Sequence, residues 1–324
     1  TESNHVKVLI DGVELNPGTL GVPSIQHVPL SLVERIEIAK GSLSTLYGKD
    51  TIGGVINIIT KKEYNSNIGE LSIKQGSYTN STQSLFKNYS IGNNNFSFGY
   101  TKNYSDGFKA KTSSNKNHSY INENINLSYS YNDKDNYIEA LFYQSDGNTE
   151  YDSFGSNLSQ DHKDANIKLS WITNSEKSNE KLIYIKKINS INQAISPATD
   201  YTHTKINEII FEKSYSNLQS LDLLFGMKFT NKILSELSYG TNFKFKNNTR
   251  EMYLQSENDL SSNSLINVGV RYINDDKYKD FFVGNINFGY FYNKNTIVSM
   301  DVGKTFRAPD GTDLFGYGGN QNLK

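Results

Sequence analysis

The stretch "LVERIEIAKGSLSTLYGKDTIGGVINIITKK", from Leu32 to Lys62, decides the fold. It ends in the run "VINIITKK", whose side chains alternate between two faces, as they do in a β-strand. Gly48, Gly53 and Gly54 stand before this run, and glycine permits positive φ angles and close approach of two backbones. The order of these features predicts a small, tightly turned unit that ends on a strand.

After about residue 63 the chain changes character and repeats a period of two, the pattern of strands with one apolar face. In "FSFGY", for example, Phe96, Phe98 and Tyr100 share one face, and Ser97 and Gly99 the other. We count about thirteen such segments of roughly 9 to 11 residues, the length of a tilted strand that crosses a bilayer. Further apolar faces are predicted at Ile125, Leu127, Tyr129 and Tyr131; Ile167, Leu169 and Trp171; Leu221, Leu223, Phe225, Met227 and Phe229; Leu237, Tyr239, Thr241, Phe243 and Phe245; and Ile286, Phe288, Tyr290 and Tyr292.

The separators between these segments come in two sizes, as in barrels with short turns on one side and long loops on the other. We expect short turns at 92–95, 132–135, 230–232 and 293–295, and long loops at 104–118, 146–164 and 190–205. All long loops must fall on one side, and this rule fails between Lys181 and Phe229 if every segment crosses. We therefore expect Ile206 to Lys213 to extend an external hairpin rather than to cross the membrane.

Composition excludes several classes of protein. The net charge of −1 gives no basic surface for nucleic acid, and the absence of cysteine excludes disulfides and thiolate chemistry. No run of 18 apolar residues exists for a transmembrane helix, so a closed barrel is the remaining way to span a membrane. Many of the 22 tyrosines lie near segment ends, where barrels carry aromatic girdles. The alternative is a soluble sandwich or β-helix, in which the apolar faces meet in an internal core.

The stretch from Leu32 to Lys62 closely resembles the second half of the plug domain of TonB-dependent outer-membrane receptors. The resemblance rests on Glu34, Arg35, Glu37, Lys40, Gly41, Tyr47, Gly48, Gly53, Gly54, Asn57 and Thr60, preceded by the strand and turn "VLIDGVELN". It departs from the family pattern at Ser42, where Pro is usual, at Thr51, where Ala is usual, and at Lys40, where Arg is commoner. Near the other end, "FRAP" (Phe306 to Pro309) and "GNQNLK" (Gly319 to Lys324) are similar to a late barrel strand and loop of the same family.

This resemblance implies a transmembrane β-barrel of antiparallel strands, about 13 of the 22 in a complete receptor, with part of a small α/β plug. We expect the C-terminal half of the plug at 1–62, a linker at 63–69 and the first part of the barrel at 70–324. Both ends of the sequence look cut. The signal peptide, the TonB box and the closing strands are expected to lie outside it.

The resemblance also implies function without catalysis: active import of a large, scarce nutrient into a bacterial cell through its outer membrane. The expected partners are outer-membrane lipid and a TonB-type energy-transducing protein, which would pull on a segment outside this chain. "YSDGFKAKT" (Tyr104 to Thr112) is similar to an outer loop of the vitamin B12 transporter branch, which favours a corrinoid ligand. The alternatives are a ferric-siderophore or haem receptor and, in another class, a passive porin or adhesin. No nucleic-acid partner is expected.

Candidate site residues follow from the same reasoning. The substrate loops would include Asp106, Phe108, Arg307, Pro309 and Tyr317, and the charged residues Glu34, Arg35, Glu37 and Lys40 are candidates for polar contacts between plug and wall. No cofactor is expected, but carboxylates at Asp146, Asp152, Asp161 and Asp164 could hold calcium in an outer loop. The five histidines are expected to be solvated loop residues, and no catalytic motif is present.

Overall fold

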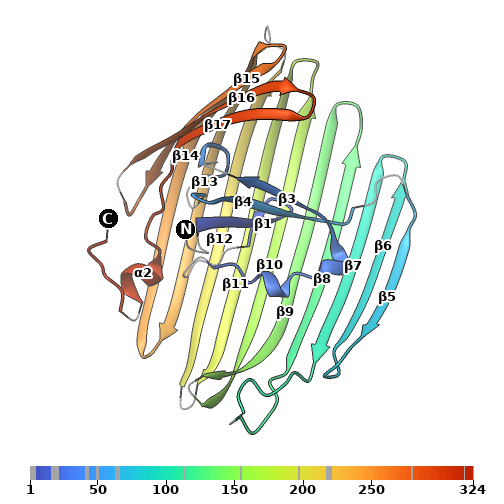
Figure 1. Ribbon diagram of the computed structural model, residues 1–324, viewed down its shortest axis with the longest axis vertical. Coiled ribbons are helices and arrows are strands. Elements are labelled where there is room, and N and C mark those ends of the chain that lie inside the picture. Colours follow the sequence, from blue (N-terminus) through green and yellow to red (C-terminus); the bar gives the residue numbers. More distant parts are fainter. Residues whose placement is uncertain are drawn as a thin grey trace.

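The computed structural model contains two sheets, one lying inside the curve of the other (Figure 1). It describes residues 5–15, 22–40, 44–48, 51–62, 66–112, 114–153, 155–195, 198–216, 221–278, 280–316 and 318–323. The smaller sheet, the plug sheet, has the strand order β2-β1-β4-β3, with β1 parallel to β4 and the other pairs antiparallel. Its strands are β1 (Val6–Ile10), β2 (Val13–Glu14), β3 (Val33–Lys40) and β4 (Gly54–Thr60). Short helices η2 (Ile25–His27), η3 (Leu30–Leu32) and α1 (Ser44–Tyr47) connect them.

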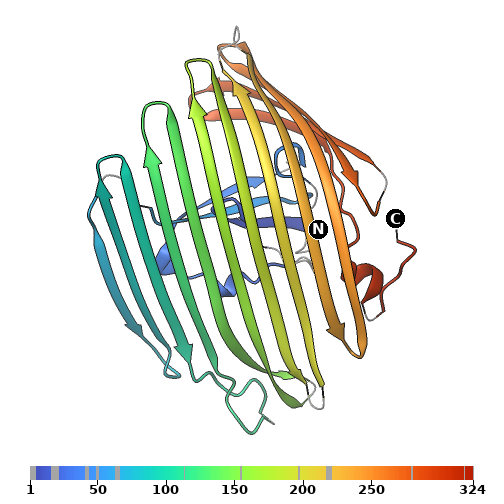
Figure 2. The same ribbon diagram turned by 180° about the vertical axis from the view of Figure 1, so that it is seen from behind.

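The larger sheet, the wall, has 13 antiparallel strands in chain order and curves around the plug sheet, which lies behind it in Figure 2. Its strands are β5 (Gly69–Gln75), β6 (Ser81–Ile91), β7 (Asn94–Ser105), β8 (Tyr120–Asn132), β9 (Asn136–Ser153), β10 (Ser156–Asn174), β11 (Ser178–Ile195), β12 (Ala198–Tyr215), β13 (Leu221–Ser238), β14 (Thr241–Ser261), β15 (Ser264–Asp275), β16 (Phe281–Asn293) and β17 (Thr296–Lys304). Helix α2 (Gly311–Phe315) follows the last strand.

The wall turns its apolar face outward and its polar face toward the plug sheet. One register row of outward side chains crosses six neighbouring strands: Leu182, Phe211, Met227, Met252, Tyr272 and Phe282. The alternate positions face inward, and most of the buried ones are polar, such as Asn88, Asn122 and Thr204. In a soluble sandwich the apolar side chains would face inward. The opposite arrangement confirms the predicted barrel wall with a plug and rules out the soluble sandwich.

Among the described residues, no helix is both long and apolar enough to cross a membrane.

Several predicted boundaries are wrong because the strands run farther than the apolar pattern. Ile206 to Lys213 is not an extension of a hairpin but part of β12, paired along its length with β11 and β13. The expected loops at 146–164 and 190–205 are hairpins of extended strand, and the expected turn at 230–232 lies inside β13. The face predicted from Leu237 to Phe245 is broken at Tyr239 and Gly240, so Leu237 points outward and Phe245 is buried inside.

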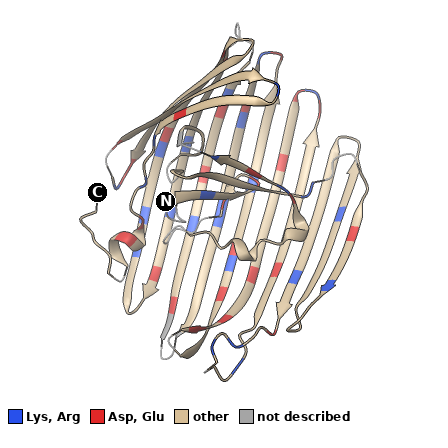
Figure 3. Ribbon diagram, viewed as in Figure 1, with Lys and Arg blue, Asp and Glu red and all other residues tan. Residues whose placement is uncertain are grey.

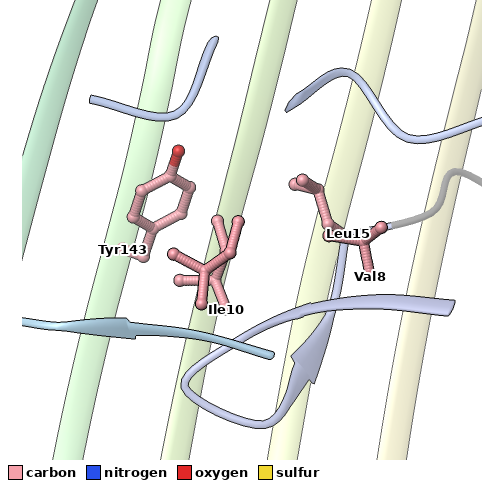
Figure 4. Packing of buried hydrophobic residues seen from close by; sticks show 5 residues of the cluster. Val8, Ile10, Leu15 and Tyr143 are labelled. Atoms are coloured by element: carbon pink, nitrogen blue, oxygen red, sulfur yellow. The ribbon is translucent and has the colours of Figure 1, made fainter. Parts of the chain in front are cut away.

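The plug packs on the wall through a few apolar contacts. Tyr143 of β9 joins Val8, Ile10, Leu15 and Ile58 of the plug in one buried cluster, four members of which are labelled in Figure 4. A second cluster places Val13 against Ile183 and Ile185 of β11. Both clusters are small, so polar contacts must supply much of the remaining attachment between plug and wall.

Candidate functional site: the interface between plug and wall

The charged motif residues of β3 pair with one another rather than with the wall. Arg35 lies 2.9 Å from Glu34 and 2.8 Å from Glu37, and its side chain is 54% exposed. These two carboxylates hold the pKa of the Arg35 guanidinium above its ordinary value, chiefly through the hydrogen bond from Arg35 to Glu37. Lys40 is exposed and makes no ion pair within the described ranges. The expected role of these four residues as plug-to-wall contacts is therefore not supported by their placement.

A buried arginine of the wall reaches the plug instead. Arg271 of β15 is 1% exposed and lies 3.0 Å from Glu251 of β14. Its Nη1 donates a hydrogen bond to the carbonyl oxygen of Thr45 in helix α1 at 2.8 Å, and its guanidinium lies 4.1 Å from the ring centre of Tyr253. A guanidinium is suited to this place because its several donors can serve a carboxylate and a carbonyl at once.

A second ionic group lies where the plug leads into the wall. Lys62 contacts both Asp11 of the plug (3.2 Å) and Glu139 of β9 (3.1 Å). Lys168 of β10 lies 3.6 Å from Glu139 and donates to the carbonyl oxygen of Asp11 at 2.8 Å. Two lysines and two carboxylates thus alternate across the interface, which keeps each buried charge close to an opposite one.

A third group surrounds Glu14 at the end of β2. Lys187 of β11 donates to the carbonyl oxygen of Glu14 at 2.6 Å, and Lys7 of β1 lies 3.8 Å from its carboxylate. Lys7 also donates to the carbonyl oxygen of the motif residue Tyr47 at 2.8 Å. These contacts connect β1, β2 and helix α1 to the wall at one place.

The charge of Glu14 is set by its surroundings. Burial alone would raise the pKa of this carboxyl, but the positive charges of Lys7, Lys232, Lys187 and Lys228 outweigh burial and lower it to about 2. The carboxylate therefore stays ionised across the physiological range.

The motif glycines serve close backbone approaches. Gly48 has φ +78°, and a Cβ there would lie 3.3 Å from Glu251 of the wall. Gly54 has φ +122°, and a Cβ there would lie 2.4 Å from the carbonyl oxygen of Ala39, which excludes other residues without a shift of the β3–β4 pair. At Gly53 a Cβ would lie 3.1 Å from the side chain of Val6.

The other motif residues hold the turns of the plug itself. The N–H of Gly12 donates to Asn57 Oδ1 at 3.1 Å, and Thr60 Oγ1 donates to Asp11 Oδ2 at 2.6 Å. These bonds close the β1–β2 hairpin against β4. Gly41 lies outside the described residues.

Two histidines form a contact that the sequence analysis missed. The rings of His27 in η2 and His162 in β10 are stacked, with centroids 3.5 Å apart and planes at 14°. Both are buried, so the expectation that they are solvated loop residues is wrong. Asn122 of β8 donates to the carbonyl oxygen of His27 at 3.0 Å, and its Oδ1 lies 2.8 Å from His162 Nε2. Burial, and then the neighbouring His162, lower the pKa of His27 to about 3.

A polar cavity of about 530 Å³ remains between the plug sheet and the wall. Charged side chains from both sides line it, among them Lys7, Glu14, Lys62, Lys168, Glu212 and Arg271. The ionic groups described above therefore border a space large enough for water. Figure 3 shows charged positions on both the plug sheet and the wall strands.

The loop candidates Asp106 and Phe108 lie between β7 and β8. Asp106 accepts hydrogen bonds from Thr79 and Tyr104, which lower the pKa of its carboxyl and tie this loop to the β5–β6 turn. Phe108 is 61% exposed, its ring 5.6 Å from that of Tyr78. Asp106 is thus engaged in holding the loop, and Phe108 is the side chain available to a ligand.

The candidates Arg307 and Pro309 lie just before α2. This helix packs on β13 and β14, several strands away from β7 and β8. Arg307 contacts Asp313 at 3.1 Å and Asp310 at 3.6 Å, and the carbonyl oxygen of Pro309 accepts from Tyr278 at 2.5 Å. Burial raises the pKa of Asp310 to about 6. The structure does not bring this pair together with Asp106 and Phe108 within the residues it describes, and Tyr317 lies outside them.

The four aspartates considered for calcium are separated along the β9–β10 hairpin. Asp146 lies 3.4 Å from Lys163, and Asp152 pairs with Lys111 at 2.5 Å. Asp161 and Asp164 accept from Asn148 and Asn189 respectively. No group of three or more metal-ligating side chains occurs in the described part of the chain. The carboxylates are used in cross-strand contacts or, at Asp152, in a contact with the loop between β7 and β8.

Comparison with solved structures gives the same fold at low sequence identity. The siderophore receptor PirA from Pseudomonas aeruginosa is 16% identical, with a TM-score of 0.77 over 95% of this chain and 55% of PirA. The copper transporter OprC is 12% identical, with a TM-score of 0.77 over 97% of this chain and 57% of OprC. The chain therefore spans little more than half the length of these proteins.

Sequence comparisons identify both parts of the chain. It is 43% identical over 77 residues to the vitamin B12 transporter BtuB of Photobacterium profundum, a match that covers 24% of this chain and 13% of BtuB. Residues 1–55 match the TonB-dependent receptor plug domain, and residues 55–324 match the TonB dependent receptor-like β-barrel. The chain belongs to the TonB-dependent receptor family.

Proposed function

We propose that this chain belongs to an outer-membrane receptor that captures a large nutrient and imports it when a TonB-type partner moves the plug. The observation that carries this proposal is a plug sheet held by polar contacts against the inward face of a wall whose outward face is apolar. These contacts are the Lys62–Glu139 ion pair and the hydrogen bonds from three wall cations to plug carbonyl oxygens. An outward apolar face suits lipid, and an occupied lumen excludes free diffusion of a large solute.

The mechanism needs two arrangements of the plug. In the resting arrangement the plug closes the lumen, and the external loops hold the ligand above it. A pull by the partner would shift or partly unfold the plug, a transition between discrete packings. The cavity beside the ionic groups lowers the cost of this step because water can reach the charges as they separate.

A corrinoid is the proposed ligand. The support is the sequence identity to BtuB, which is 43% over 77 residues, while the solved receptors share only the fold at 12% to 16% identity. Among the loop candidates, the exposed Phe108 offers an apolar contact for such a ligand. A ferric siderophore or haem is the alternative ligand class.

The test measures ligand binding to the full-length receptor purified in detergent. Cyanocobalamin, a ferric catecholate siderophore and haem are titrated separately by fluorescence quenching. If the ligand is a corrinoid, we expect saturable binding of cyanocobalamin alone, with weaker binding by the Phe108→Ser variant. Binding should be unchanged in Phe282→Ser, which replaces an exposed apolar side chain on the outward face of the wall. Saturable binding of the siderophore or of haem, and not of cyanocobalamin, would contradict the corrinoid proposal and favour that other ligand class.

Planar bilayer recordings separate this proposal from the porin alternative. A plugged receptor should conduct little without its partner. Steady ion current from the intact receptor, together with no binding of any of the three ligands, would favour a passive pore.

A further inference from the structure

Five exposed cations lie together on the outward face of β11, β12 and β14: Lys186, Lys205, Lys244, Lys246 and Arg250. We call this set the basic patch. It is separate from the plug, the loop candidates and the inward charges, and the proposed import mechanism does not use it.

Register places the basic patch just beyond the apolar belt of the wall. One outward row runs from Tyr184 through Ile209 and Phe229 to Arg250. The next three rows toward the β11–β12 turn carry the lysines. The first begins with Lys186, the second contains Lys205 and Lys246 on either side of Ile233, and the third ends with Lys244.

That end of the wall is the external one. It carries the longest connection between wall strands, the loop at 106–119. Two-residue turns occur at both ends, at 239–240 on this end and at 92–93 and 262–263 on the other. Barrels of this kind keep short turns on the periplasmic side and longer loops outside. The basic patch therefore lies at the level where the external leaflet would place its headgroups.

Three outward cations elsewhere on the wall are paired with acids across strands, and those of the basic patch are not. Lys102 lies 2.8 Å from Glu123, Lys213 lies 2.7 Å from Glu180, and Lys163 lies 3.4 Å from Asp146. None of the five patch cations has an ion pair within the part of the chain that the structure describes.

The neighbouring outward positions hold no acid. Along β11 to β14 they are occupied by Asn, Ser, Ile and His side chains, such as Asn207, Asn231 and His203. Two acids lie at the border. Asp276 accepts from the backbone and side-chain N–H groups of Asn248 at 3.0 and 2.8 Å, and Asp280 accepts from Tyr272 at 2.7 Å and from Asn274, the register partner of Arg250, at 2.8 Å. The surface therefore has unbalanced positive charge in a position where an anion is the complementary occupant.

The spacing fits a ligand with more than one phosphate. Strands lie about 4.8 Å apart and alternate residues about 7 Å apart. Lys205 and Lys246 are therefore separated by roughly 10 Å. On β14, Lys244 lies roughly 7 Å and Arg250 roughly 14 Å from Lys246. The apolar belt below them, including Phe229, Met227 and Met252, would receive acyl chains. A soluble anion would gain nothing from this belt, whereas a lipid gains from both surfaces.

We propose that the basic patch binds the phosphate groups of an anionic lipid of the external leaflet, with the acyl chains lying on the adjacent apolar belt. This inference rests on the proposed outer-membrane location of the receptor.

The test compares lipid binding by two triple variants of the full-length receptor. Lys205→Gln, Lys244→Gln and Lys246→Gln together remove three patch charges. Lys134→Gln, Lys177→Gln and Lys294→Gln together remove three exposed charges from turns at the opposite end. Each delipidated protein is titrated with lipid A, which carries two phosphates, and with zwitterionic phosphatidylcholine, and bound lipid is counted by native mass spectrometry at two salt concentrations.

Each lysine near an anionic headgroup strengthens binding by roughly fivefold. For three lysines we therefore expect the patch variant to lose about a hundredfold in apparent affinity for lipid A at low salt, with little loss in the control variant. Equal binding by the two variants, or equal binding of lipid A and phosphatidylcholine, would overturn the inference. Membrane fractionation distinguishes this failure from that of the proposed function: receptor absent from the outer membrane contradicts the location, whereas receptor present there with an inert patch contradicts only the lipid site.

Discussion

Two parts of the wall face the same plug with different chemistry. Strands β6 to β8, the neutral arc, present only uncharged side chains inward, among them Ser84, Asn88, Ser97, Thr101, Asn122 and Asn124. Strands β11 to β15, the charged arc, present Lys187, Glu208, Glu212, Lys228, Glu251 and Arg271 inward. The neutral arc holds the plug by neutral hydrogen bonds. The charged arc holds it by hydrogen bonds from the cations Lys187 and Arg271 to plug carbonyl oxygens, and its ion pairs join its own strands to one another.

The difference indicates how the plug is held and where it can move. Buried amide and hydroxyl groups contribute modestly when paired and depend little on salt, because no net charge is involved. A buried ion pair stabilises a structure only while both partners are present and water is excluded from them. Since the cavity of about 530 Å³ borders the charged arc, we expect movement of the plug to begin there.

The largest effect is expected from removal of one buried charge of the charged arc. Arg271→Met removes the guanidinium that lies 3.0 Å from the buried Glu251, and loss of one member of a buried ion pair costs about 3–5 kcal/mol. We expect a lower melting temperature of the receptor in detergent and faster cleavage of the plug by protease. The double variant with Glu251→Gln should recover much of the loss, since no unpaired charge remains. A double variant as damaged as the single one would mean that the arginine acts through its bond to Thr45 alone.

A smaller effect is expected at the centre of the neutral arc. Asn122 is fully buried and bonds to the carbonyl oxygen of His27, to Ser145 and to His162. Asn122→Ala leaves these groups unpaired, and we expect a loss of about 1–3 kcal/mol from the free energy of unfolding. Asn132→Ala, an exposed position on the same strand, is the control and should leave the melting temperature unchanged. A loss as large as that from Arg271→Met would remove the distinction between the two arcs.

His27 is a titratable plug residue in contact with the neutral arc. The pKa of His27 is lowered to about 3, whereas an unfolded histidine titrates near 6.5. The neutral ring therefore stabilises the folded plug fully above pH 6.5, and this contribution falls as the pH drops from 6.5 toward 3. The slope should reach at most about 1.4 kcal/mol per pH unit. Protease resistance of the plug measured across this range should decline less steeply in His27→Gln. Parallel curves for the two proteins would show that His27 does not titrate in the unfolding step.

The sequence predicts what is local in this fold. Alternation along a strand depends only on neighbouring positions, so the outward faces around Phe98, Leu127 and Leu169 were predicted correctly. The plug motif was recognisable because its glycines and strand residues stand in a fixed order over about thirty residues. Contacts between distant elements have no such signal, and His27 and His162 are brought together only by the docking of the plug on β10.

The boundary errors also have physical causes. Ile206 to Lys213 carries Glu208 and Glu212, which would be unsuited to the lipid-facing side of a strand, but both face the lumen and meet Lys228 and Lys181 there. At Tyr239 and Gly240 both φ angles are positive, as in a two-residue hairpin turn, a position where Asn or Asp would have been the usual signal. Because the apolar alternation continues across this turn, the sequence pattern concealed it.

The smallest effect is expected at Arg35, a charged residue of the plug motif. Arg35 is exposed on β3 and pairs with Glu34 and Glu37 of the same strand. In Arg35→Gln, water would solvate these two carboxylates in place of the guanidinium. We expect no measurable change in melting temperature or in protease resistance of the resting plug. Lys62→Gln, a buried lysine bridging Asp11 and Glu139, is the matched comparison and should destabilise the plug. If Arg35→Gln instead abolishes import while the resting plug stays intact, its role lies in a displaced arrangement of the plug, and the two arcs describe only the closed receptor.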